Sequence, residues 1–175
     1  MEQGLVWQYL CVIKKGAMAL KKTIAIIAST NEKAAAIVNK LSLDNFRLLI
    51  LSKYANQFRK LSKDIASNHP NVELEIIDCM KDGCWEADII ILDIPHDEET
   101  EVAALIKEVA TQKIVLSFSE NENEELQNLL KYSKIVSAFN IPGSAQISVC
   151  GKDHDAVLEV SGILKKLAQN KAQVH

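Results

Sequence analysis

Glycine is scarce in this chain of 175 residues, which contains six glycines and none from Ala17 to Met80. The shortage matters most in the segment TIAIIASTNEKAAAIV, residues 23–38. An apolar run, a short polar break and an alanine-rich helical pattern follow one another there, as they do at the start of a dinucleotide-binding fold. A glycine-rich phosphate loop is expected at the break, and this chain places other residues in it.

Other shortages exclude whole classes of function. Lys and Arg number 20 against 23 Asp and Glu, and the absence of a basic excess argues against nucleic acid as a partner. No apolar stretch approaches the roughly 18–20 residues that a membrane-spanning helix needs. The four cysteines have no C-x-x-C spacing and the four histidines do not cluster with them, so we expect reduced thiols in a cytoplasmic protein and no metal site.

Segments of strand length alternate with segments of helical period along most of the chain. Several of the former are apolar almost throughout, which is typical of strands buried on both faces of a parallel sheet. This alternation predicts an α/β fold, a doubly wound and mainly parallel Rossmann-type sheet with helices on both faces, whose ligands bind outside the carboxyl ends of the strands. The predicted strands are 23–28, 47–51, 73–78, 88–94, 113–118, 134–139 and 146–150.

Apolar spacing predicts the buried face of each helix between these strands. We expect turns at 68–71 and 81–83, and a helix N-cap at Asp153. The predicted core faces are Ala34, Ile37, Val38 and Leu41; Ala55, Phe58, Leu61 and Ile65; Val102, Leu105, Ile106 and Val109; Leu126, Leu129 and Leu130; and Val157, Val160, Leu164 and Leu167.

The chain divides into one domain and two short ends. Residues 23–170 are expected to form a single NAD(P)-binding Rossmann-like domain, and residues 171–175 a tail. Residues 1–22 are expected to be an N-terminal extension that is disordered or an artefact of a start site upstream of Met18, and the alternatives for residues 1–17 are an extra strand or an anchor helix.

Four segments together resemble one known family. Residues 23–53 are similar to the N-terminal half of the deazaflavin-coenzyme-dependent NADP oxidoreductases, which are related to the N-terminal domains of pyrroline-carboxylate reductases. The segments EADIIILDIPHDEETEVAALI, KIVSAFNIPGS and SVCGKDHDAVLEVSGILKKL resemble later strands and helices of that family, in the same order. The similarity extends from 23 to 169 and implies an NADP-binding Rossmann domain that takes part in hydride transfer.

The phosphate loop of that family has the pattern G-G-T-G-x-x-G. When this chain is aligned with that pattern without a gap, the seven positions are occupied by Ala28, Ser29, Thr30, Asn31, Glu32, Lys33 and Ala34. Alanine is an accepted alternative at the last position, where helix and strand pack closely. Asn31 replaces a glycine for which we expect a positive φ, and asparagine is the non-glycine residue that best adopts one. The β-carbons of Ala28 and Ser29 could push a pyrophosphate away.

The residues that follow the second predicted strand indicate which dinucleotide would bind. The family's Ser-Arg pair becomes Ser52-Lys53 here. NAD-specific domains place Asp or Glu at this point to bind the ribose 2′-hydroxyl, whereas a hydroxyl and a cation suit a 2′-phosphate. The resemblance therefore implies NADP rather than NAD as the cofactor, and the alternative is that Lys53 is an ordinary surface lysine.

The nicotinamide side is expected where the fourth and sixth strands end. The resemblance adds Ile94, Pro95 and Asn140 to the cofactor-binding residues, and His96 is a candidate catalytic residue that could donate a hydrogen bond. A lone histidine beside a helix start is more often structural or solvated. Asp93, at the end of an apolar strand, is expected to cap a neighbouring loop rather than to catalyse.

Two main functions remain open, beside a lesser alternative in which a different small nucleotide or metabolite binds in the same crevice. The first is an NADP-binding, hydride-transferring reductase or its cofactor-binding remnant, with a dinucleotide and a second small redox molecule as ligands. The second is a non-catalytic Rossmann domain that has lost the dinucleotide and acts as an interaction or regulatory module. The missing glycines favour the second, as do the short segment 143–148 and the chain end at His175, where the family is longer. A homo-oligomer or a protein partner is compatible with both.

Overall fold

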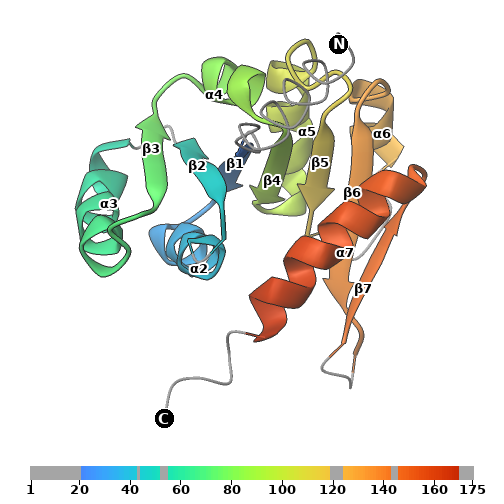
Figure 1. The fold of residues 1–175 in the computed structure, drawn as a ribbon. Coiled ribbons are helices and arrows are strands. Elements are labelled where there is room, and N and C mark those ends of the chain that lie inside the picture. Colours follow the sequence, from blue (N-terminus) through green and yellow to red (C-terminus); the bar gives the residue numbers. More distant parts are fainter. Residues whose placement is uncertain (1–20, 43, 52–54, 119–123, 143–145, 170–175) are drawn as a thin grey trace, which may run out of the picture.

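The computed structural model describes residues 21–42, 44–51, 55–118, 124–142 and 146–169. Strands and helices alternate along almost this whole range (Figure 1). In chain order they are β1 Lys22–Ala28, α2 Asn31–Leu41, β2 Phe46–Leu51, α3 Ala55–Asn68, β3 Glu73–Ile77, α4 Met80–Glu86, β4 Ile89–Asp93, α5 His96–Ile106, β5 Ile114–Ser117, α6 Glu124–Leu129, β6 Lys134–Asn140, β7 Ile147–Gly151 and α7 His154–Gln169.

The strands form one sheet in the order β3-β2-β1-β4-β5-β6-β7. Neighbouring strands are parallel except for β7, which runs antiparallel to β6. The chain moves outward from β1 to β3 and then returns to place β4 on the other side of β1, so the strand order reverses between β1 and β4. A crevice at such a reversal is where doubly wound sheets bind their ligands. The predicted fold class is confirmed.

Two layers of helices cover the sheet, because its central strands are apolar on both faces. Ile24, Ile26 and Leu48 pack with residues of α2, α3 and α7 on one face. Ala25 and Ile27 pack with residues of α4, α5 and α6 on the other. Figure 1 shows α7 crossing one side of the sheet, with α5 and α6 on the opposite side. Each predicted strand is present, with ends that agree to within one residue.

One predicted turn is wrong. Residues 81–83 lie inside α4, whose Gly83 and Cys84 are buried. A β-carbon added at Gly83 would lie 2.1 Å from Cδ2 of Leu51, so glycine here allows the helix to approach β2 closely. The sequence Lys-Asp-Gly resembles a turn because glycine punctuates loops more often than it serves helix packing.

The predicted core face of α5 needs two corrections, the first being that Val109 follows the end of the helix and is only half-buried. Val102 and Ile106 are buried as expected, but Leu105 is 44% exposed and Ala103 is fully buried in its place. A small side chain lets α5 lie close to the sheet there. The predicted residues of α2 are all buried, as are Phe58 in α3 and Val160 in α7.

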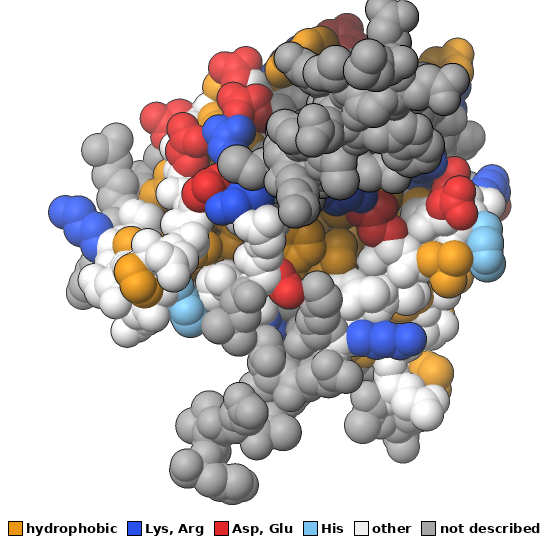
Figure 2. All heavy atoms as spheres, in the orientation of Figure 1, with side chains coloured by type: hydrophobic (Ala, Val, Ile, Leu, Met, Phe, Trp, Pro, Cys, Tyr) orange, Lys and Arg blue, Asp and Glu red, His pale blue; other side chains and the backbone are white. Residues whose placement is uncertain are grey.

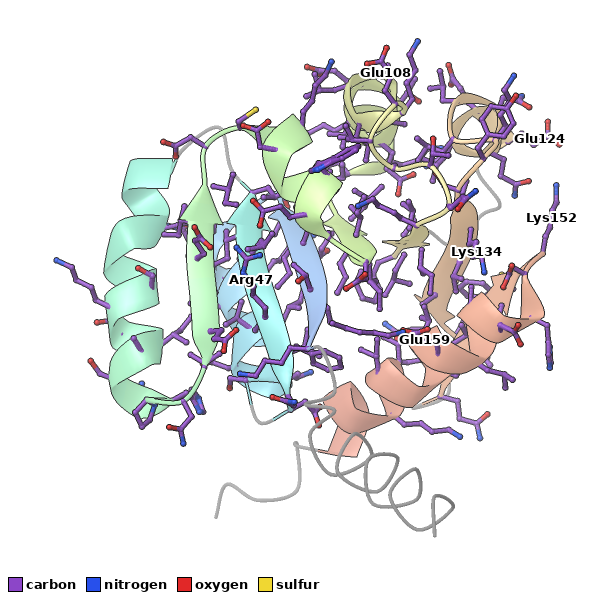
Figure 3. The ribbon with its side chains drawn as sticks, turned by 45° about the horizontal axis from the view of Figure 1, so that its top comes forward. Arg47, Glu108, Glu124, Lys134, Lys152 and Glu159 are labelled. Atoms are coloured by element: carbon purple, nitrogen blue, oxygen red, sulfur yellow. The ribbon has the colours of Figure 1, made fainter. Side chains whose placement is uncertain are left out.

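Charged side chains of both signs are distributed over the surface. On the face drawn in Figure 2, lysines and arginines lie among aspartates and glutamates. Arg47 of β2, labelled in Figure 3, bonds Glu75 of β3 at 2.7 Å and Glu86 of α4 at 2.6 Å, which raises the pKa of its guanidinium. Within the described ranges, none of the helices combines the length and the apolar character that crossing a membrane requires.

Candidate functional site

The β1–α2 connection lies at the point where the strand order reverses. Ala28, the last residue of β1, pairs in register with Asp93, the last residue of β4. The backbone N–H of Ser29 donates to the carbonyl oxygen of Asp93 at 3.1 Å, so the connection turns directly over the end of β4. The structure thus places the predicted phosphate loop at the carboxyl edge of the sheet.

Thr30 ends the loop and caps α2. Its backbone is extended, with φ −136° and ψ 158°, and its Oγ1 accepts a hydrogen bond from the backbone N–H of Lys33 at 3.3 Å. This is the usual geometry of a threonine N-cap. The expectation of a positive φ at Asn31 is wrong, since among the described non-glycine residues only Gln112 has one. Because Thr30 caps the helix, Asn31 can begin it with ordinary helical geometry.

The small residues of the loop have different surroundings. Ala34 is fully buried, as expected of the position where α2 packs on the strand. Ala28 is half-buried and packs against the core on the α2 and α7 side. Ser29 is exposed. Of the two β-carbons that could oppose a pyrophosphate, that of Ser29 is therefore the one to consider.

Charged side chains of opposite sign meet beside the loop. The carboxylate of Glu32 accepts hydrogen bonds from its own backbone N–H and from the Thr30 side chain, and both lower its pKa. The ammonium of Lys33 lies 2.9 Å from Oδ1 of Asp93. An anion bound at the start of α2 would gain from the helix dipole and from Lys33, and it would be opposed by Glu32 and Asp93.

The second half of the predicted site follows β4 and β6. Ile94 is half-buried and Pro95 is the N-cap of α5, which begins at His96. Asn140 ends β6 and is exposed. β5 lies between β4 and β6, so Asn140 is two strand spacings, roughly 10 Å, from the end of β4. Asn140 shares the sheet edge with Pro95 and His96 without being next to them.

Sequence reasoning missed a polar cluster beside His96. Nδ1 of His96 lies 3.2 Å from Oε2 of Glu99, and the hydroxyl of Ser117, at the end of β5, donates to Oε1 of Glu99. Glu99 is 1% exposed, while the His96 side chain is 63% exposed. The spacing along the sequence indicates that Glu99 is buried. Glu99 lies three, four and seven residues before the buried Val102, Ala103 and Ile106, and so on the same face of α5.

Two predicted residues, Ser52 and Lys53, lie outside the described residues. The preceding residue, Leu51, ends β2 and pairs in register with Ile27 of β1. The end of β2 is thus next to the end of β1, where the loop begins. The described residues contain no group of three or more His, Cys, Asp or Glu side chains that could hold a metal ion.

A cavity of about 380 Å³ lies at the opposite edge of the sheet, between α6, β6 and the end of β7. Lys134, at the start of β6, and Lys152, just after β7, line it and are labelled in Figure 3. Lys134 lies 3.2 Å from Asp153, whose Oδ1 accepts from the Ala156 N–H as the predicted N-cap of α7; these bonds lower the pKa of Asp153. The cavity is separate from the predicted site.

The strand order, with the loop at its reversal point, defines the protein as a Rossmann-type α/β domain. The solved structures that resemble it support this class. A pyrroline-5-carboxylate reductase from Coxiella burnetii aligns with a TM-score of 0.66 and 17% identity, covering 84% of this chain and 57% of its own length. A Plasmodium falciparum pyrroline carboxylate reductase solved with NADP bound has a TM-score of 0.63 and 15% identity, covering 86% of this chain and 56% of its own length.

Sequence comparison connects the chain with a particular enzyme. It is 28% identical over 167 residues to the F420-dependent NADP reductase of Methanocaldococcus jannaschii, an alignment that spans 76% of this chain and 74% of the relative. F420 is a deazaflavin, so the resemblance predicted from the sequence motifs is confirmed. No family model matches the chain.

Proposed function

We propose that this protein is an NADP-dependent reductase of the Rossmann class, which binds the dinucleotide over the β1–α2 loop and takes part in hydride transfer. The observation that carries the proposal is the loop itself. It turns over the end of β4 at the reversal of strand order, with Thr30 capping α2 and Ala34 packed beneath. Similarity to an F420-dependent NADP reductase adds the chemistry.

The loop fits a pyrophosphate in spite of its missing glycines. Ala28 packs against the core, and the positive end of the α2 dipole favours an anion at the helix start, where the N–H groups of Glu32 and Lys33 already donate within the first turn. Ser29 presents only a small side chain. Glu32 and Asp93 oppose an anion, so we expect binding weaker than that of a loop with all its glycines.

We assign the 2′-phosphate to Ser52 and Lys53 on the evidence of the sequence. They follow β2, and the ribose-binding residue of a dinucleotide fold follows the same strand. Neither Asp nor Glu occurs at 52 or 53 to select NAD. The expected preference is therefore for NADP.

Ile94, Pro95 and Asn140 are proposed to border the nicotinamide, with His96 as the candidate catalytic residue. When bound, the dinucleotide supplies the hydride. The task of the protein is to orient it and to offer a hydrogen bond at the reacting end. His96 suits this task because Glu99 fixes one ring nitrogen while most of the ring is exposed.

A binding measurement tests the cofactor assignment. Titration calorimetry with NADP⁺ and NAD⁺ should show tighter binding of NADP⁺, and Lys53→Gln should remove the difference. Lys63→Gln, on the exposed face of α3, removes the same charge elsewhere and should leave the preference intact. Equal affinities for the two dinucleotides in the unaltered protein would overturn the assignment.

An activity measurement separates the reductase from a non-catalytic module. With NADPH as donor and oxidised F420 as acceptor, the absorbance of NADPH at 340 nm should fall only when protein is present. Tight NADP⁺ binding without oxidation of NADPH would leave a cofactor-binding module. The relative with a known activity is a reductase, which favours catalysis over a cofactor-binding module.

Location and further partners are part of the proposal. Cys79, Cys84 and Cys150 are free thiols, which is consistent with the cytoplasm. A second small redox molecule is the expected acceptor or donor. A homo-oligomer or a protein partner is compatible with the proposal.

A further inference from the structure

Lys33 and Asp93 form an ion pair across the mouth of the predicted dinucleotide site. Lys33 belongs to the first turn of α2 and Asp93 ends β4, sixty residues later in the chain. The distance from Nζ to Oδ1 is 2.9 Å. The Lys33 side chain is 47% exposed and that of Asp93 21% exposed, so both side chains are open to solvent beside the loop.

Asp93 contacts the loop twice. Its carbonyl oxygen accepts the N–H of Ser29, and its carboxylate holds Lys33. The residues before it in β4, Ile89–Leu92, are all buried and apolar. A carboxylate here is not needed for strand packing, and it places a negative charge where the proposed ligand would bring its own.

Lys33 can leave this partner. A lysine carries a compact charge on a flexible four-carbon stem and binds phosphate as a point charge. From the first turn of α2 the same ammonium can turn from Asp93 to a phosphate placed over the helix start. The phosphate and Asp93 then compete for one cation.

We propose that Lys33 is the pyrophosphate-binding cation of this loop and that Asp93 is its internal competitor, which holds the affinity for the dinucleotide low. The inference rests on the proposed function, because it assumes that a dinucleotide pyrophosphate enters this crevice. Lys33 contacts the ligand, whereas Asp93 acts through Lys33 and is a positioning residue. The Lys33 cation lies in a loop that lacks the glycines that usually let the backbone approach a pyrophosphate closely.

The two partners of the pair should change the affinity in opposite directions. Asp93→Asn keeps the shape of the side chain and frees Lys33, so NADP⁺ should bind more tightly, by roughly three- to tenfold. Lys33→Gln should weaken binding by a similar factor and reduce its dependence on salt. Asp64→Asn, an exposed residue of α3, removes the same charge as Asp93→Asn and should leave the affinity within about twofold.

Calorimetric titration of these variants with NADP⁺ is the test, and adenosine 2′-monophosphate is the second probe because it lacks the pyrophosphate. Opposite changes for NADP⁺, and none for adenosine 2′-monophosphate, support the proposal. If the unaltered protein binds NADP⁺ and Asp93→Asn binds it no more tightly, the competitor role is wrong and the proposed function stands. If neither protein binds NADP⁺ at millimolar concentration, both fail. Circular dichroism melts show that each variant is folded at the titration temperature.

Discussion

Gly83 and Gly162 show how differently two helical glycines can be used. Gly83 is buried in α4, and a β-carbon added to it would clash with Leu51, whereas a β-carbon added at Gly162 in α7 would meet no atom within 4 Å. The first glycine sets the distance between a helix and a strand. The second has no such task and only weakens its helix.

Alanine should therefore have opposite effects at these two positions. Gly83→Ala should lower the free energy of unfolding by about 1–3 kcal/mol, because Leu51 is itself buried and cannot move freely away. Gly162→Ala should raise it by about 0.5–1 kcal/mol through helix propensity. Urea unfolding of both variants measures the changes. Equal changes in the two would contradict the close approach of α4 to β2.

Burial should also make the cysteines differ in their reactivity toward an alkylating reagent. Burial raises the pKa of the Cys84 thiol to about 12, and the nearby Lys113 ammonium opposes this only in part. Cys79 is exposed. At pH 8 iodoacetamide should label Cys79 and leave Cys84 unmodified until the protein unfolds, as read by mass spectrometry. Labelling of Cys84 at the rate of Cys79 would contradict the burial of Cys84.

The raised pKa of Cys84 also predicts how stability depends on pH. An unfolded thiol ionises near pH 9, so this group should lower the free energy of unfolding as the pH rises from about 9 to 12.

The elements at the carboxyl edge are joined by polar contacts that no single element reveals. Glu99 of α5 is buried by the packing of that helix, and Ser117 of β5 meets it from the sheet. Acidic residues at the start of a helix interact favourably with the helix dipole, and this alone explains Asp97 and Glu98. The burial of Glu99 depends on which face of α5 the sheet covers.

Two substitutions and their combination test this cluster. Glu99→Leu should destabilise by about 1–3 kcal/mol, because it leaves the buried Ser117 hydroxyl without its acceptor. Adding Ser117→Ala should recover part of the loss, since both polar groups are then gone. Chemical denaturation of the single and double variants gives the coupling energy. Strictly additive changes would show that Glu99 and Ser117 do not interact.

At the scale of the whole molecule, the sequence was enough to predict the strands and their order along the chain. Each central strand is buried on both faces, and so an apolar run such as residues 48–51 identifies it without knowledge of its neighbours. The position of the loop at the sheet edge follows from strand order in a doubly wound fold. The resemblance to a known family led to the prediction of NADP as the cofactor.

The sequence did not predict tertiary contacts between residues that are far apart in the chain. The Lys33–Asp93 pair joins residues sixty positions apart: the sequence led us to expect Asp93 to cap a neighbouring loop, but its carboxylate instead pairs with the Lys33 ammonium. α4 was mistaken for a turn because the packing of Gly83 on Leu51 is a tertiary contact. The expected positive φ at Asn31 failed because it came from the glycine pattern, while Thr30 gave the loop another geometry.

The central claim is that NADP binds over the β1–α2 loop, and an NMR titration tests it most directly. Addition of NADP⁺ to the ¹⁵N-labelled protein should shift the backbone amides of Ser29, Lys33 and His96 most strongly. These residues surround the ends of β1 and β4. The claim is contradicted if no amide shifts at millimolar NADP⁺, or if the shifts gather around Lys134 and Lys152 at the opposite edge of the sheet.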